Sequence, residues 1–162
     1  MNLRINPIDA ETCARLRELD DAGRPPVESV DITGGAPLRC CLTRACPGDR
    51  IALVSYAPLA RWAAETGADP GPYDERGPVF IHATPCVGPA EGWPVGMHTG
   101  PRVLRAYDAD GRILGGRLVR PAEAAAGAAD LLAAPGVAVL HVRAVEFGCF
   151  MHEVRRGQGA TA

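Results

Sequence analysis

Residues 137–143 read Val-Ala-Val-Leu-His-Val-Arg, and this short stretch decides the expected fold. Side chains of a β-strand alternate between its two faces, so Val139, His141 and Arg143 share one face, and Ala138, Leu140 and Val142 share the other. An apolar face opposite a face with histidine and arginine is typical of a strand whose sheet packs on a core from one side. The sequence therefore predicts a sheet with a polar face.

The rest of the chain predicts an α+β fold, with a mainly antiparallel sheet. An N-terminal helix is expected to begin at Pro7 after an Asn6 cap and to end at Gly23. An alanine-rich helix is expected over residues 121–134, before the last two strands, with Pro135-Gly136 as its stop signal. Further strands are expected at residues 51–56, 79–83, 103–107, 112–119 and 145–154, and a short helix at residues 59–66.

The length and composition fit one globular domain. The chain has 162 residues, of which 47% are hydrophobic and 22% charged. We expect a single domain over residues 1–156 and a disordered tail over residues 157–162. Residues 84–101 contain four prolines and four glycines and are expected to form a long surface loop.

The charge and composition argue against several classes of protein. All 17 basic residues are arginine, so enzymes that need a lysine, such as Schiff-base, pyridoxal-phosphate and P-loop enzymes, are excluded. A net charge of −2 gives no indication of binding to nucleic acid or to an anionic membrane. The apolar stretches are too short to cross a bilayer, and no apolar signal core follows Met1, so we expect a cytoplasmic protein.

Strand alternation also identifies a candidate site. Arg105 and Tyr107 share a strand face, as do His141 and Arg143, and His82 lies near the end of a third strand. If these faces converge, they form a pocket that suits a small anionic partner, because guanidinium groups bind carboxylate or phosphate through two hydrogen bonds. The alternative is that each face is the solvated side of a half-buried sheet. The predicted ligand-binding residues are Arg39, Arg105, Tyr107 and Arg143.

The histidines and cysteines suggest two kinds of chemistry. His82 and His141 are the acid–base candidates, and Cys41, Cys86 or Cys149 could supply a nucleophilic thiolate, with Cys41 and Cys149 as the predicted catalytic cysteines. The spacing His82-x3-Cys86, with Cys149 added, could instead hold a zinc ion. None of the six cysteines forms a Cys-x-x-Cys pair, and buried cysteines usually serve as small core residues. His98 and His152 are expected to be solvated.

Several blocks of the sequence together resemble one bacterial family, domain of unknown function 1203. The resemblance covers roughly residues 36–155 and implies a small standalone cytoplasmic domain, with no established activity. Leu38 stands where this family often has a cysteine, which weakens a metal site with two ligands from this segment, and residues 59–69 look like added length. The blocks are Arg39-Cys40-Cys41-Leu42, Gly71-Pro72-Tyr73, Gly77 to Ala83 with Cys86, Leu104 to Tyr107, His141-Val142-Arg143 and Phe147 to Phe150.

Three functions remain open from the sequence. The leading hypothesis is a small-molecule enzyme or ligand-binding domain whose pocket holds a carboxylate or phosphate group. The alternative is a non-catalytic module with a zinc site, and zinc is the one cofactor considered. The third is an interaction protein without a pocket, with an exposed apolar patch on residues 84–101.

Overall fold

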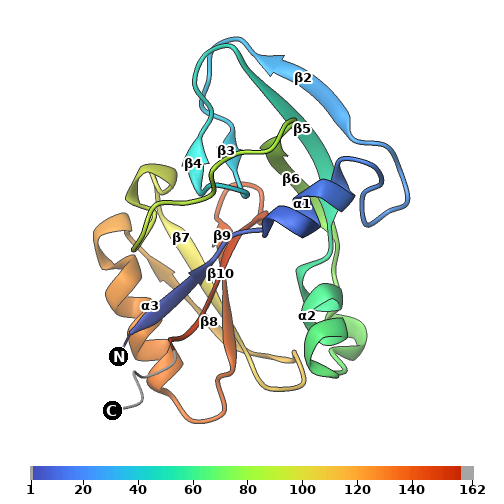
Figure 1. Ribbon diagram of the computed structural model, residues 1–162. Coiled ribbons are helices and arrows are strands. Elements are labelled where there is room, and N and C mark those ends of the chain that lie inside the picture. Colours follow the sequence, from blue (N-terminus) through green and yellow to red (C-terminus); the bar gives the residue numbers. More distant parts are fainter. Residues whose placement is uncertain (1, 158–162) are drawn as a thin grey trace, which may run out of the picture.

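A computed structural model describes residues 2–157 and shows two five-stranded sheets with three α-helices around them (Figure 1). The first sheet is antiparallel, in the order β1 (Leu3–Asn6), β10 (Phe150–Arg156), β9 (Val139–Ala144), β7 (Arg102–Tyr107) and β8 (Ile113–Val119). The second has the order β2 (Val27–Asp31), β5 (Asp49–Tyr56), β6 (Gly77–His82), β3 (Pro37–Leu38) and β4 (Thr43–Arg44). The helices are α1 (Ala10–Leu16), α2 (Pro58–Thr66) and α3 (Ala124–Ala133). The predicted α+β class is confirmed.

The alanine-rich helix α3 covers one face of the first sheet. It follows a one-turn 3-10 helix at Pro121–Glu123, and its buried residues include Ala128 and Leu132. These pack with Leu104, Leu140 and other side chains of β7 and β9 in one hydrophobic cluster. A Cβ atom on Gly127 would lie 3.1 Å from Val119 Cγ1, so the helix approaches the sheet closely there. The helix predicted before the last two strands is therefore confirmed.

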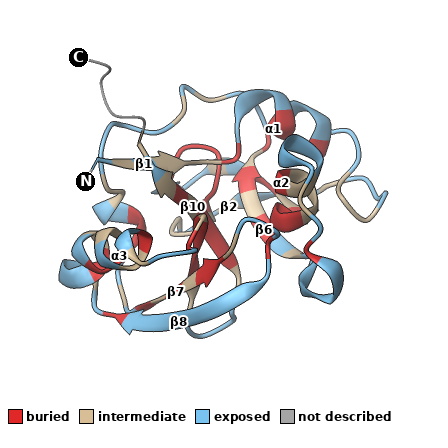
Figure 2. Cartoon of the chain, turned by 90° about the horizontal axis from the view of Figure 1, so that it is seen from below, coloured by how far each residue is buried: buried red, intermediate tan, exposed pale blue. Residues whose placement is uncertain are grey.

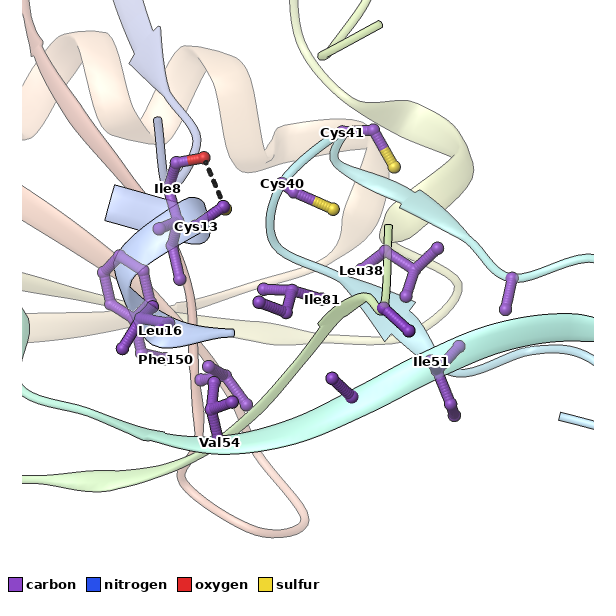
Figure 3. Close-up of a cluster of buried hydrophobic side chains, with 14 residues drawn as sticks. Ile8, Cys13, Leu16, Leu38, Cys40, Cys41, Ile51, Val54, Ile81 and Phe150 are labelled. Atoms are coloured by element: carbon purple, nitrogen blue, oxygen red, sulfur yellow. Dashed lines mark hydrogen bonds between the residues drawn. The ribbon is translucent and has the colours of Figure 1, made fainter. Parts of the chain in front are cut away.

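The second sheet has its own core, which α1 completes. Cys13 and Leu16 of this helix pack against Ile51, Val54 and Ile81 of β5 and β6 (Figure 3). A third and smaller cluster joins Leu59 and Trp62 of α2 to residues of β7 and β9. Thus α2 lies over the face of the first sheet that α3 leaves uncovered. Figure 2 shows β10 and much of β7 buried and β1 intermediate, while β8, at the other edge of the first sheet, is exposed along most of its length.

The N-terminal prediction was only partly right. Asn6 does not cap a helix: it ends strand β1, and its side-chain amide donates to Glu153 Oε1 over 2.8 Å. The cap is Asp9, whose carboxylate accepts from the backbone N–H of Thr12 over 2.8 Å. Residues 3–6 pair with β10 at the edge of the first sheet, and the helix is shorter than the predicted span from Pro7 to Gly23.

Two other segments differ from the expected ones. The last strand starts at Phe150 and not at residue 145, because residues 145–149 form a turn in which Gly148 has φ +67°. Residues 27–31, where no strand was expected, pair with β5 as strand β2. Apart from Gly157, the tail predicted as disordered lies outside the described residues. No helix in residues 2–157 has the length and apolar character needed to cross a membrane.

Candidate functional site

A pocket of about 370 Å³ opens where the two sheets meet. Arg105 of β7 and Arg143 of β9 contribute to its wall from the first sheet, and Tyr56 at the end of β5 contributes from the second. Glu75 and Cys149 line it from the turns before β6 and β10. The structure thus brings two of the predicted ligand-binding residues and one predicted nucleophile into a single cavity.

The two arginines converge on one carboxylate. Arg105 Nη1 lies 2.8 Å and Arg143 Nη1 lies 2.6 Å from the same oxygen, Glu75 Oε1. The register explains this: Arg105 pairs with His141 and Val103 pairs with Arg143, so the arginines are diagonal neighbours on one sheet face. Arg143 is further fixed because its Nε donates to the carbonyl of Gly148 over 2.8 Å.

Tyr107 and His141 lie on the same sheet face but contribute no atom to the pocket wall. The imidazole of His141 packs between the rings of Tyr107 and Phe150, with centroid distances of 4.7 and 5.0 Å. Among the described residues, neither ring nitrogen of His141 nor the Tyr107 hydroxyl has a well-directed hydrogen bond. Burial lowers the pKa of His141 well below its ordinary value, so the ring is neutral at physiological pH. Burial also raises the pKa of Tyr107.

Cys149 is the one predicted nucleophile that reaches this pocket. It is partly exposed, and its thiol lies 3.7 Å from the carbonyl of Phe147 in the same turn. Cys41, another candidate, is buried, and its thiol lies 3.0 Å from the Thr43 hydroxyl in a different part of the fold. The two thiols therefore have separate environments.

Arg39, a predicted ligand-binding residue, does not line the pocket and instead bonds to the backbone of other segments. Its side chain is buried, with a residue exposure of 3%, and does not line the cavity. Its Nε donates to the carbonyl of Phe150 over 2.8 Å, and its Nη1 donates to the carbonyl of Pro37. These bonds tie the β3 region to the start of β10. Burial lowers the pKa of Arg39 to about 10, so it still carries a positive charge at neutral pH.

The strand that contains His82, β6, belongs to the second sheet, so His82 does not line the pocket with Arg105 and Arg143. Its backbone N–H donates to the sulfur of Cys40 over 3.3 Å. The alternative metal set of His82, Cys86 and Cys149 is likewise not assembled, because Cys149 lines the pocket while Cys86 lies near Cys40 and Cys41. Among the residues that the structure describes, Cys40, Cys41 and Cys86 form the group with metal-ligand spacing.

Two features of the structure carry no recognisable signal in the sequence. Glu75 supplies the countercharge of the pocket, but an acid in a turn-rich segment carries no signal of its partner. His98 and His152, expected to be solvated, are buried, and their Nε2 atoms lie 2.8 Å apart. That prediction was wrong because Trp93, in the long loop, packs against both imidazole rings. Arg102 Nε donates to His98 Nδ1 over 3.1 Å.

Comparison with known proteins identifies a family but no characterised relative. Residues 35–156 match the family described as Protein of unknown function (DUF1203). This segment contains the pocket arginines, Glu75 and Cys149, and it leaves out β1, α1 and β2. No curated protein and no solved structure matches the chain. The match spans well over half of the sequence, and the chain is therefore a member of the DUF1203 family.

Proposed function

We propose that this protein binds a small molecule through a carboxylate or phosphate group held by Arg105 and Arg143. One observation carries the proposal: Nη1 atoms of both arginines lie within 2.8 Å of a single carboxylate oxygen. That oxygen belongs to Glu75, which stands where the anionic group of a ligand would stand. Arg105 Nη1 donates a charge-assisted hydrogen bond to this oxygen, of a kind that contributes roughly 1.5–3 kcal/mol, whereas Arg143 Nη1 makes an ion pair with it that lacks well-directed hydrogen-bond geometry.

The charges and mobility of the three groups favour exchange of Glu75 for a ligand. The pocket wall carries three guanidinium groups, those of Arg76, Arg105 and Arg143, and one carboxylate, that of Glu75, so its charged side chains leave a net positive charge. The Arg143 side chain is only 10% exposed, whereas that of Glu75 is 43% exposed and lies in a turn. The arginine is therefore held in place before binding, which reduces the entropy lost on association. The more exposed glutamate is the group that moves.

The rest of the wall indicates what the ligand carries besides its charge. A volume of about 370 Å³ is at the lower end of ordinary small-molecule sites. Tyr56 and Phe150, whose ring centroids lie 5.3 Å apart, give the pocket an apolar side. We therefore expect a compact ligand with an anionic end and an apolar or aromatic end.

A covalent reaction is the second candidate, because the Cys149 thiol lines the same wall as the arginines. An anion held by the arginines would place an electrophilic carbon of the ligand near this sulfur. Conversion of Cys149 to serine is expected to abolish turnover of such a ligand while preserving its binding. Loss of binding and turnover together would argue against a nucleophilic role.

Isothermal titration with phosphate, phenyl phosphate, benzoate and succinate at fixed ionic strength tests the binding proposal. We expect at least one of these probes to bind, and R143Q to weaken its affinity by roughly 10-fold or more. The matched control is R50Q, which removes an exposed arginine that pairs with Glu28 on the second sheet. Equal affinities in R143Q and R50Q, or no binding of any probe to the wild type, would contradict the proposal.

A further inference from the structure

We propose that Cys40, Cys41 and Cys86 form a binding site for a thiophilic d10 metal ion, Zn²⁺ or Cu⁺. Their three sulfur atoms all lie within 4.8 Å of one another. Zinc–sulfur bonds of about 2.3 Å in a tetrahedron place the sulfurs roughly 3.8 Å apart, so small side-chain rotations suffice to bind an ion. The site is separate from the arginine pocket, which none of the three cysteines lines.

The local backbone brings these thiols together from distant parts of the chain. Cys40 and Cys41 follow β3 in a turn closed by the N–H of Leu42, which donates to the carbonyl of Leu38 over 2.9 Å. Leu42 has φ +54°, a left-handed conformation that is strained for a residue other than glycine. Figure 3 shows both cysteines on this turn, with Cys13 of α1 on the side of Cys40. Backbone strain in a turn that carries two thiols favours a binding site over a role of these cysteines as core residues alone.

The sulfur atoms already have the outer hydrogen bonds that metal thiolates require. The backbone N–H of His82 donates to Cys40 Sγ over 3.3 Å, and the Thr43 hydroxyl lies 3.0 Å from Cys41 Sγ. Such second-shell groups orient ligands and stabilise their negative charge. Arg17 holds the segment before Cys86, because its guanidinium donates to the carbonyls of His82 and Thr84, each over 3.0 Å.

The donor set and its exposure select the kind of ion. Three thiolates and no carboxylate favour soft ions over Mg²⁺ or Ca²⁺. Cys40 and Cys41 are buried while Cys86 is half-buried, so an ion reaches the site from the side of Cys86. A thiol binds a metal ion as the thiolate, so metal binding is expected to release protons.

The experiment uses the reduced, metal-free protein under anaerobic conditions. Co²⁺, the spectroscopic substitute for Zn²⁺, is expected to bind one equivalent with a sulfur-to-metal charge-transfer band, which Zn²⁺ then removes. Competition against a chromogenic Cu⁺ chelator measures the affinity of the protein for Cu⁺. C86S is expected to lower the affinity by at least about 100-fold, since even outer-shell groups contribute 10–100-fold.

The controls separate a metal site from loss of folding and from oxidation. Cys86 is the preferred position because it is only half-buried, and circular dichroism checks that C86S is folded. C46S removes an exposed thiol outside the group and is expected to bind metal like the wild type. Equal affinity in C86S and C46S, or no band and no competition in the wild type, would overturn the proposal. So would a disulfide between these cysteines in a protein that takes up no metal.

Discussion

Arg143 Nη1 lies 2.6 Å from Glu75 Oε1, although the arginine side chain is nearly buried and the glutamate side chain is not. The pair joins strand β9 of the first sheet to the turn before β6 of the second. The exposed Glu75 side chain has room to move away from this contact, whereas the nearly buried Arg143 side chain does not. The glutamate is thus both a structural contact and a tethered occupant of the proposed anion position.

Replacement of Glu75 by glutamine tests this double role. Because the variant leaves the Arg143 guanidinium without a countercharge, we expect its free energy of unfolding to fall by about 1–3 kcal/mol. We also expect inorganic phosphate at millimolar concentration to restore much of the loss, because the anion position is now vacant. Urea unfolding with and without phosphate, at constant ionic strength, measures both effects. An identical response to phosphate in the wild type and E75Q would argue against Glu75 as a competitor.

Arg39 is expected to contribute to stability and not to ligand affinity. In Arg39→Lys, one ammonium group cannot reach both the Phe150 and the Pro37 carbonyls, so we expect a loss of about 2–4 kcal/mol in the free energy of unfolding. Affinity for the anionic probes is expected to stay within twofold of the wild type. A tenfold loss of affinity in a stably folded R39K protein would instead place this guanidinium in the binding site.

The buried histidine pair predicts acid sensitivity. Burial lowers the pKa of His98 from about 6.5 to about 4 and that of His152 to about 3. Above pH 7 both residues are neutral in the folded and unfolded states and contribute no pH dependence. Between about pH 6.5 and 4 the unfolded chain binds protons that the folded protein excludes, so stability falls as the pH falls.

The size of this effect can be measured in a variant. Each histidine contributes up to about 1.4 kcal/mol per pH unit to the slope of stability against pH. H98Q is expected to reduce the slope between pH 6 and 5, whereas R50Q, whose charge is constant in this range, is expected to leave it unchanged. Urea unfolding at several pH values provides the slope, and parallel profiles for H98Q and the wild type would show that His98 does not titrate as described.

Tyr107→Phe is expected to be tolerated. The phenol is fully buried, and its hydroxyl has no well-directed hydrogen bond among the described residues. Removing the hydroxyl leaves the ring packed on His141 and gives up only a poorly directed contact with Arg105. We expect the free energy of unfolding to stay within about 1 kcal/mol of the wild type or to rise. A loss above 2 kcal/mol would show that the hydroxyl has a partner.

The sequence was sufficient to predict that Arg105 and Arg143 lie together, but not where His82 and Asn6 lie. Alternation along neighbouring strands placed Arg105 and Arg143 on one face, because β7 and β9 pair directly. Alternation could not show that His82 lies apart from these arginines, since it indicates the face of a strand on which a side chain lies and not the sheet to which the strand belongs. The helix-capping pattern at Asn6 was overridden by strand pairing with β10.

Contacts between distant segments explain the other differences. The burial of His98 and His152 depends on how Trp93 folds back over them, which no local pattern encodes. The thiol cluster likewise depends on a tertiary contact between the turn after β3 and the loop after β6. Spacing along the chain pointed to Cys86 as a candidate metal ligand, but not to Cys40 and Cys41, whose thiols lie close to it.

The most direct test of the proposed anion site compares two cysteines in one protein. Cys149 lines the arginine pocket, and Cys46 is exposed outside it. The rate of alkylation by iodoacetamide is measured at each residue by peptide mass spectrometry, with and without phenyl phosphate or benzoate at constant ionic strength. We predict that the bound anion slows alkylation of Cys149 but not of Cys46, and that R143Q abolishes this protection. Unchanged alkylation of Cys149 at saturating concentrations of both probes would contradict a site built on Arg105 and Arg143.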